Sequence, residues 1–237
     1  MRRRSGVIQR ENPSSLASGA APAQDASLVA SKSLVDRLGE RLRRAAATEA
    51  DLRTLDEYRS SFDEAYRSVI TTIREKLHKR PSGRPRKTTD SIVAKLKRET
   101  IRLSQMQDIA GCRLIVADVR EQDRLVDDLK RLFPEHTVID RRRHPSHGYR
   151  AVHVIAEVQG KPVEIQVRTR LQDLWAQLCE VRSDEIDKDL KYGGGPTEER
   201  RDLDTLSQLV YHVEIGKLKH SRLKTAGREL LMLFTKR

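Results

Sequence analysis

The chain has 237 residues, enough to bury a proper core as one domain with extensions, and it is 35% charged, 37% hydrophobic and 4% aromatic. Its 47 Lys and Arg against 35 Asp and Glu give a net charge of +12, which favours polyanionic partners such as nucleotides, RNA or an acidic surface. Cys112 and Cys179 are too few for a disulfide framework or a zinc site, and they indicate small core residues in a reducing cytoplasm. No apolar stretch reaches transmembrane length.

The first part of the chain predicts a tail followed by helices. Residues 1–26 are rich in Ser, Ala, Pro and Arg without periodicity, which is typical of a disordered segment. Prolines and a glycine predict a loop before the second half of the chain, and Thr89 or Asp90 is expected to cap the helix after it. The predicted elements are a tail over 1–26, helices over 28–47 and 49–79, a loop over 81–89 and a helix from there to about 103.

The rest of the chain alternates strand and helix patterns around one small sheet. The predicted elements are a strand over 109–116, a helix over 120–133, a short strand over 137–139, a basic loop over 141–147, a hairpin within 148–169, a helix over 169–185 and a last helical region over 198–234. We therefore expect an α/β (α+β) fold with a small mixed sheet and helical extensions at both ends. The expected division is a tail over 1–26, N-terminal helices over 27–80, a core over 81–192 and a C-terminal helical region over 193–237.

The hairpin is the most informative segment, because apolar and polar residues alternate on both sides of Gln159-Gly160. A two-residue turn there pairs Val158 with Lys161, Val154 with Ile165, Val152 with Val167, His153 with Gln166, Ile155 with Glu164 and Ala151 with Arg168. One face then holds only apolar residues. The other face gathers His153, Glu164, Gln166 and Arg168, with Tyr149 just before the strand. This polar face is either a site or an ordinary solvated sheet surface.

Two further groups of residues suit phosphate chemistry. Cations gather in a loop and the first turns of a helix, where free backbone donors also favour anions: Arg84, Arg86, Lys87, Lys95 and Lys97. Asp108 precedes a strand and could share Mg²⁺ with Glu164, since this ion takes one or two protein carboxylates together with phosphate and water. Structural alternatives remain open: a solvated basic face, Asp108 as a turn cap, and Arg113 paired with a buried acid.

Three motifs together resemble a known family. Asp-Ile-Ala-Gly-Cys-Arg at 108–113, Gly-Tyr-Arg-Ala-Val-His at 148–153 and Glu-Ile-Gln-Val-Arg-Thr at 164–169 are similar, in order and approximate spacing, to the synthetase domain of the RelA/SpoT family, whose enzymes make guanosine 3'-pyrophosphate alarmones. The loop before Lys87, with Ser91 and Lys95, is similar to the family's ATP-binding segment. The resemblance covers roughly residues 50–192, and without a His-Asp hydrolase motif it implies a stand-alone small alarmone synthetase.

The resemblance implies a role for each matching residue. By this resemblance, Asp108 binds Mg²⁺, and Glu164 activates the acceptor's 3'-hydroxyl or shares the metal. On the donor side, ATP phosphates are held by Lys87, Lys95 and Arg113, and Arg84 lies near adenine. On the acceptor side, Tyr149 stacks on guanine, and the acceptor and donor phosphates are positioned by His153, Gln166 and Arg168. The chain departs from the family pattern in places. Arg86 is an alternative to Arg84, and Glu180 is an alternative source of an acid where Gln177 stands.

The leading hypothesis is an ATP-dependent and Mg²⁺-dependent pyrophosphokinase that acts on GTP or GDP, on a nucleotidyltransferase-like core. The more basic loop over 141–147 keeps open a relative that modifies the 3' end of tRNA. A catalytically silent nucleotide-binding or RNA-binding regulator is the third reading. The expected location is the cytoplasm, without a membrane partner, and self-association is left open.

Overall fold

The structure of the protein is a computed structural model, which describes residues 31–219 and 221. The tail predicted over 1–26 and the end of the last helical region therefore lie outside the described residues. The helices are α1 Lys32–Arg43, α2 Glu49–Ser60, α3 Asp63–Leu77, α4 Thr89–Arg98, α5 Val119–Leu132, α6 Arg170–Glu185 and α7 Thr197–Glu214, with 3-10 turns η1 Leu103–Gln105 and η2 Leu190–Tyr192. The strands are β1 Ser82–Arg84, β2 Ala110–Val116, β3 His136–Asp140, β4 Val152–Val158 and β5 Lys161–Thr169.

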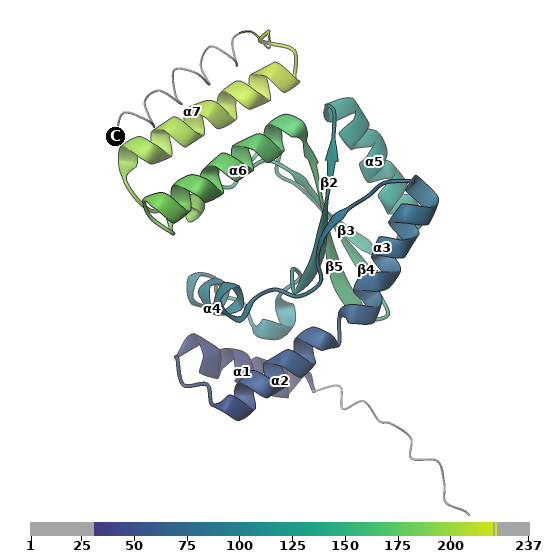
Figure 1. The fold of residues 1–237 in the computed structure, drawn as a ribbon, viewed down its shortest axis with the longest axis vertical. Coiled ribbons are helices and arrows are strands. Elements are labelled where there is room, and N and C mark those ends of the chain that lie inside the picture. The colour runs from purple at the N-terminus through teal and green to yellow at the C-terminus, as the bar shows by residue number, and fades with distance from the viewer. Residues whose placement is uncertain (1–30, 220, 222–237) are drawn as a thin grey trace, which may run out of the picture.

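A single five-stranded sheet in the order β1-β2-β5-β4-β3 organises the described residues (Figure 1). β2 and β5 run parallel, and the other neighbouring strands run antiparallel. The mixed sheet and its flanking helices confirm the predicted α/β fold class. The parallel pair places Arg113 opposite Gln166, which brings two polar motifs that are far apart in the sequence onto the same face.

The hairpin forms as predicted because its turn residues suit a tight connection. Gln159 and Gly160 have φ values of 52° and 68°, the positive values that a type I′ turn requires at both central positions. Five of the six predicted pairs are confirmed. The sixth, Ala151 with Arg168, stays a prediction, because Ala151 precedes β4; its carbonyl accepts a hydrogen bond from the Arg141 amide at 2.9 Å.

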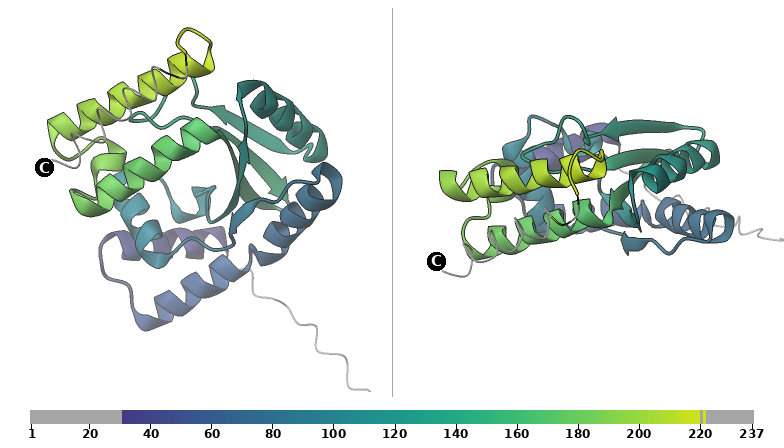
Figure 2. Two further views of the ribbon diagram at one scale, coloured as in Figure 1. Left: turned by 45° about the horizontal axis from the view of Figure 1, so that its top comes forward. Right: turned by 90° about the horizontal axis from the view of Figure 1, so that it is seen from above.

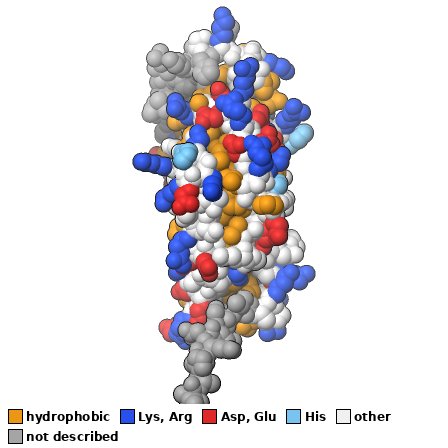
Figure 3. Space-filling view, turned by 90° about the vertical axis from the view of Figure 1, so that its right-hand side faces the viewer, with side chains coloured by type: hydrophobic (Ala, Val, Ile, Leu, Met, Phe, Trp, Pro, Cys, Tyr) orange, Lys and Arg blue, Asp and Glu red, His pale blue; other side chains and the backbone are white. Residues whose placement is uncertain are grey.

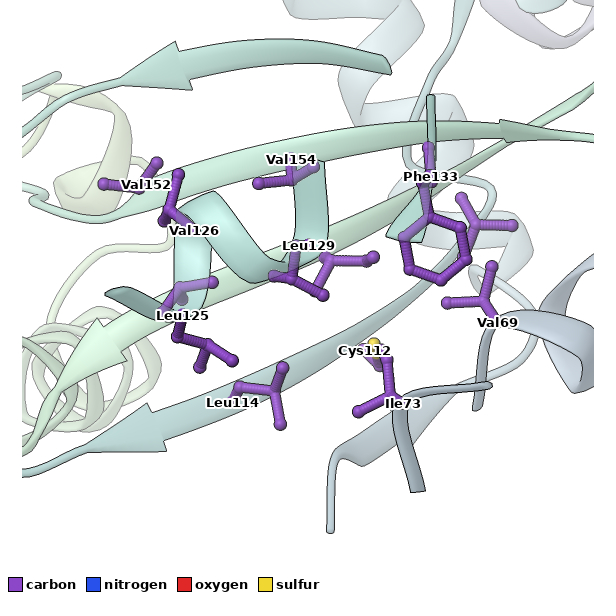
Figure 4. Packing of buried hydrophobic residues seen from close by; sticks show 14 of the residues in the cluster. Val69, Ile73, Cys112, Leu114, Leu125, Val126, Leu129, Phe133, Val152 and Val154 are labelled. Atoms are coloured by element: carbon purple, nitrogen blue, oxygen red, sulfur yellow. The ribbon is translucent and has the colours of Figure 1, made fainter. Parts of the chain in front are cut away.

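The apolar face of the sheet packs against α3 and α5, as Figure 4 shows at close range. Val152 and Val154 of β4 and Cys112 of β2 meet Leu129 of α5 and Ile73 of α3, and all five are buried. Cys112 is a free thiol in this core, as is Cys179 elsewhere, which confirms that both are small buried residues. Because the helices cover this face, the opposite face is left to carry polar side chains.

Helices flank the polar face of the sheet as two separate groups (Figures 1 and 2). On one side, α1, α2 and α4 share a cluster that includes Leu38, Leu55 and Leu96. On the other, α6 and α7 lie side by side and bury Trp175 and Leu203. The polar face therefore lies between α4 and α6. Among the described helices, none combines the length and apolarity needed to cross a membrane.

Several predicted boundaries are wrong, each for a local reason. The helix expected over 49–79 breaks into α2 and α3 at Ser61 and Phe62, where Phe62 is buried in the core and stands at the N-cap position of α3 without a side-chain cap hydrogen bond. The loop expected over 81–89 contains β1, where Gly83 fits against the hydroxyl of Tyr66 and a side chain would not. Thr88, not Thr89 or Asp90, is the N-cap of α4.

One predicted helix is also shorter than expected. α4 ends at Arg98, where Glu99 becomes extended and lets the buried Leu103 begin a separate turn. α7 forms the first part of the last predicted helical region and ends at Glu214, two residues before Gly216 with its φ of 75°.

Charge is spread over the face that carries α3 and α5. Figure 3 shows basic and acidic side chains interspersed there, so the excess of positive charge forms no patch of one sign on this face. The cations that matter for an anionic ligand must instead be sought on the polar face of the sheet.

Candidate active site

A pocket of about 990 Å³ opens over the polar face of the sheet, with walls from α4, β2, the hairpin, α6 and the turn at 190–192. Eight of the ten predicted site residues line it: Lys95, Asp108, Arg113, Tyr149, His153, Glu164, Gln166 and Arg168. Arg84 and Lys87 do not line it but contact Asp108, which does. The hairpin's polar face is therefore the floor of a cleft and not a plain solvated surface.

Two lysines hold Asp108 at one part of the pocket. Lys87 Nζ donates to Oδ2 at 2.7 Å and Lys95 Nζ donates to Oδ1 at 2.9 Å, while Arg84 reaches the Asp108 carbonyl at 3.4 Å. Burial alone would raise the pKa of Asp108, but the two lysine charges lower it to about 2. Asp108 therefore stays ionised, and its carboxylate partners are lysines, which disfavours the alternative of a simple turn cap.

Lys87 is held in place by its backbone as well as by its charge. Its amide donates to the Ile109 carbonyl at 2.7 Å, and its carbonyl accepts from Arg59 of α2 at 3.0 Å. Burial lowers the pKa of Lys87, opposed by the charge of Asp108. A buried ammonium with one carboxylate partner is a strong site for a second anion, since a phosphate could share it.

The polar side chains of the hairpin form a closed ring of hydrogen bonds. Glu164 Oε1 lies 2.7 Å from His153 Nδ1, and His153 Nε2 lies 3.0 Å from the hydroxyl of Tyr149. Arg168 Nη2 donates to that hydroxyl at 3.0 Å and to Gln166 Oε1 at 2.9 Å. Gln166 Nε2 closes the ring by donating to Glu164 Oε2 at 2.7 Å.

The hydrogen bonds of this ring end at Glu164, whose carboxylate can only accept. Arg168 can only donate to the Tyr149 hydroxyl, so when neutral His153 carries its proton on Nδ1, the hydroxyl donates to Nε2 and Nδ1 donates to Glu164. Burial opposes the charged form of Glu164, but the hydrogen bond from His153 leads the effects that hold its pKa below the ordinary value. Burial likewise raises the pKa of Tyr149, which therefore remains a neutral phenol.

Asp173 anchors the arginines of the site, and sequence reasoning missed it. Its Oδ1 accepts from Arg168 at 3.1 Å and from Arg113 at 3.3 Å, and its Oδ2 accepts from Gln177 at 2.6 Å. Arg113 thus has the buried acid that the structural alternative proposed, while its side chain still faces the pocket. An unpaired guanidinium within a strand was the signal that an acid must lie near it.

The structure places the two alternative residues differently. Arg86 forms a bidentate ion pair with Asp63 of α3 and does not line the pocket, and its role as an alternative to Arg84 stays a prediction. Glu180 does line the pocket, but it pairs with Lys191 at 2.7 Å, near the rim. Gln177, which also lines the pocket, supports Asp173.

The basic loop over 141–147 is partly neutralised within the protein. Arg142 pairs with Asp140 at 2.6 Å and with Asp123 at 2.5 Å. Burial alone would lower the pKa of Arg142, but the two carboxylates outweigh it and raise the pKa above the ordinary value. Arg141 and His147 of the same loop line the pocket instead. The loop is therefore as much a wall of the cleft as an outward basic surface.

The residues present fit a divalent cation. Asp108 and Glu164 both line the pocket, and both are kept ionised by their partners. Each carboxylate oxygen accepts one hydrogen bond from the protein and retains a second lone pair. Mg²⁺ needs no more than one or two such carboxylates when phosphate oxygens and water complete its shell.

Part of the chain matches known proteins in sequence. Residues 83–183 match a family model described as a region found in RelA / SpoT proteins. An uncharacterized protein of Mycobacterium tuberculosis is 40% identical over 117 residues, which is 47% of this chain and 42% of that protein. A probable chloroplastic GTP diphosphokinase of Oryza sativa is 31% identical over 133 residues, 49% of this chain and 18% of that protein. The chain thus spans less than half the length of these curated relatives.

Solved structures share the fold. The small alarmone synthetase 1 of Bacillus subtilis bound to its product pppGpp superposes with a TM-score of 0.53 at 25% identity, covering 72% of this chain and 95% of that one. A Streptococcus mutans protein superposes with a TM-score of 0.52 at 22% identity, covering 74% of this chain and 98% of that one. The sheet and its flanking helices therefore have the same fold as these two proteins.

Proposed function

We propose that this chain is an ATP-dependent pyrophosphokinase that makes (p)ppGpp from GTP or GDP, because residues 83–183 match a region found in RelA / SpoT proteins. One observation carries the proposal: a single pocket is lined by a carboxylate held between lysines, Asp108, and by a carboxylate held in a hydrogen-bonded ring, Glu164. Cations near one acid suit a triphosphate, and an oriented acid beside an aromatic residue suits a nucleoside hydroxyl.

In the proposed reaction the 3'-hydroxyl oxygen of the guanine nucleotide attacks the β-phosphorus of ATP. The new O–P bond replaces the bond between the β-phosphorus and the oxygen bridging to the α-phosphate, and AMP leaves with that oxygen. Such transfers depend on alignment and charge neutralisation more than on covalent help from the protein. The pyrophosphoryl group keeps its own β–γ linkage throughout.

The donor side of the site is assigned to the lysines and arginines around Asp108. Lys87 and Lys95 would move part of their hydrogen bonding from Asp108 to the ATP phosphates, and Arg113, which pairs with Asp173 in the same pocket, would be a further cation for them. Arg84, at the exposed edge of β1, would lie near the adenine. Their combined positive charge would offset that of the triphosphate and of the transition state.

The acceptor side is assigned to the hairpin ring. Glu164 would accept a hydrogen bond from the 3'-hydroxyl and receive its proton as the new bond forms, because a carboxylate held at a low pKa does not remove such a proton beforehand. Tyr149 would stack on the guanine, and His153, Gln166 and Arg168 would hold Glu164 and the phosphates in register. The ring keeps these groups oriented before the substrate arrives.

Asp108 and Glu164 are the residues that would hold Mg²⁺ together with ATP phosphate oxygens. When bound, the ion would supply further neutralisation of phosphate charge. The lysines that contact Asp108 would then turn toward phosphate, so binding of the ion and of ATP would support each other.

The tRNA-modifying alternative is not favoured. It rests on the basic loop, where Arg142 is already held by Asp140 and Asp123. The reading as a silent regulator is weakened because both presumed acids, Asp108 and Glu164, are present and ionised. A cytoplasmic location and the division into a core over 81–192 with helical extensions stay predictions, and self-association stays an open alternative.

The test is a product assay with acceptors in parallel. Purified protein is incubated with ATP labelled in the β- and γ-phosphates, Mg²⁺, and GDP, GTP or tRNA. We expect AMP together with label on ppGpp or pppGpp. Label on tRNA alone would favour the alternative acceptor, and no AMP with any guanine nucleotide would overturn the proposal.

A further inference from the structure

The C-terminal helix α7 lies beyond the matched region 83–183, yet it reaches the segment that carries Tyr149. Ser207 of α7 is buried, and its hydroxyl donates to the Gly148 carbonyl at 2.6 Å while it accepts from Arg150 Nε at 3.0 Å. One side chain of α7 thus binds the residues on both sides of Tyr149. Nothing in the chemistry proposed above uses this contact.

Arg150 ties the same segment down from a second direction. Its guanidinium lies 4.6 Å from the ring centre of Tyr211 of α7, and its Nη1 donates to the Arg142 carbonyl in the basic loop. The Arg150 side chain is almost fully buried. The Arg150 guanidinium therefore links α7 to the loop and does not face a ligand in the pocket.

Gly148 shows how closely α6 and α7 approach this segment. Its φ is 81°, and a side chain there would lie 2.6 Å from the ring of Trp175 and 3.2 Å from Asp204. Trp175 in turn donates from its indole nitrogen to the Leu203 carbonyl of α7 at 2.8 Å. Gly148 is therefore enclosed by the pair of helices, and the backbone leading into Tyr149 has little freedom.

We propose that α7 is a working part of the acceptor side, with Ser207 as a positioning residue that fixes the shape of residues 148–150 and so places Tyr149 against the guanine nucleotide. The inference rests on the proposed function for its ligand, but the restraint itself is a property of the fold. Tyr149 belongs at once to the hairpin ring, through His153 and Arg168, and to this restrained segment. Loosening the segment would disturb the acceptor more than ATP, whose lysines come from α4 and the loop before it.

The test compares Ser207→Ala with Thr205→Ala, because Thr205 lies on the exposed face of the same helix and its hydroxyl bonds only within α7, to the Arg201 carbonyl. In Ser207→Ala we expect amide hydrogen exchange over residues 146–152 to quicken by about tenfold. The KM for GDP or GTP should rise by about fivefold to tenfold, while the KM for ATP changes by less than about twofold. Thr205→Ala should match the wild type in each measurement.

A second variant keeps the test decisive if Ser207→Ala folds poorly. Arg150→Lys keeps the charge but loses the forked contact with Ser207 and the Arg142 carbonyl, so it should shift exchange and acceptor KM in the same direction. Unchanged exchange over 146–152 in both variants, or an equal rise in the KM of both substrates, would overturn the inference. If the wild type makes no AMP with any guanine nucleotide, the proposed function fails separately, and the exchange measurement still decides whether α7 restrains the segment.

Discussion

Asp108 and Glu164 are the two carboxylates of one pocket, and they are held by opposite means. Asp108 faces lysine ammonium groups on flexible stems, at 2.7 and 2.9 Å. Glu164 faces His153 and Gln166, both locked in a ring on the strands of a hairpin. Point charges on long side chains can change partner when a phosphate arrives, whereas a closed ring on rigid strands holds one geometry. The first arrangement suits capture of a charged donor, and the second suits alignment of a reacting hydroxyl.

The strongest test of this difference between the two carboxylates is to neutralise Glu164. Glu164→Gln keeps the shape but removes the charge, so turnover should fall by about a hundredfold or more, the scale of losing general acid-base help. Binding of ATP should change little, since its lysines lie at Asp108. Steady-state kinetics and ATP titration measure both quantities.

The matched control is Glu157→Gln, an exposed acid on the neighbouring strand, which should behave as the wild type. Folding is judged against Val154→Asp, which places a charge in the apolar core and should lower the free energy of unfolding by about 4 kcal/mol or more. A melting temperature for Glu164→Gln as low as that of Val154→Asp would make Glu164 a structural residue.

Removing the aromatic surface beside the ring tests whether alignment depends on stacking. Tyr149→Ala should weaken binding of the guanine nucleotide by roughly 1 to 3 kcal/mol and leave ATP affinity nearly intact. Tyr149→Phe keeps the ring and loses only the hydroxyl shared by His153 and Arg168, so acceptor binding should be largely retained. Equilibrium titration with each nucleotide separates the two variants, and equal losses in both would assign the effect to the hydroxyl.

The charge held by the lysines predicts a dependence of stability on pH. The folded-state pKa of Asp108 is about 2 against an ordinary 3.8, so its ionised form stabilises the fold above about pH 4. That contribution, roughly 2 kcal/mol, is lost as the pH falls from about 4 toward 2. The difference in melting temperature between the wild type and Asp108→Asn should therefore be constant near neutral pH and shrink below about pH 4. A difference that persists unchanged at pH 2 would show that the charge is not responsible.

The smallest expected effect belongs to a single lysine. Lys95→Gln should lower the affinity for ATP by about fivefold, because one of several cations is removed. The loss of affinity should become smaller at high salt. Lys97→Gln, two residues along on the exposed side of α4, is the control and should change ATP affinity by less than about twofold. Equal effects of the two substitutions would mean that the general positive field, and not the contact at Asp108, attracts ATP.

The sequence was sufficient for the parts of the site that depend on local pattern. Alternation and a Gln159-Gly160 turn determine the register of the hairpin, so its polar face could be predicted together with its members. The partners of those members could not, because Asp173 reaches Arg113 only through the packing of α6 on the sheet. The contact of Ser207 with Gly148 joins residues 59 apart in the chain and leaves no periodic trace. Local pattern locates the strands, and tertiary packing determines which residues complete the hydrogen-bond network of the site.

The enclosure of Gly148 by an indole ring has an optical consequence. The sequence contains a single tryptophan, so all indole fluorescence of the protein comes from Trp175, which is buried between the segment before Tyr149 and the Leu203 carbonyl. The emission therefore reports on one place in the molecule, the junction of the acceptor segment with α6 and α7. No label is required to follow that junction while nucleotides are added, and a guanine nucleotide should alter the signal more than ATP does.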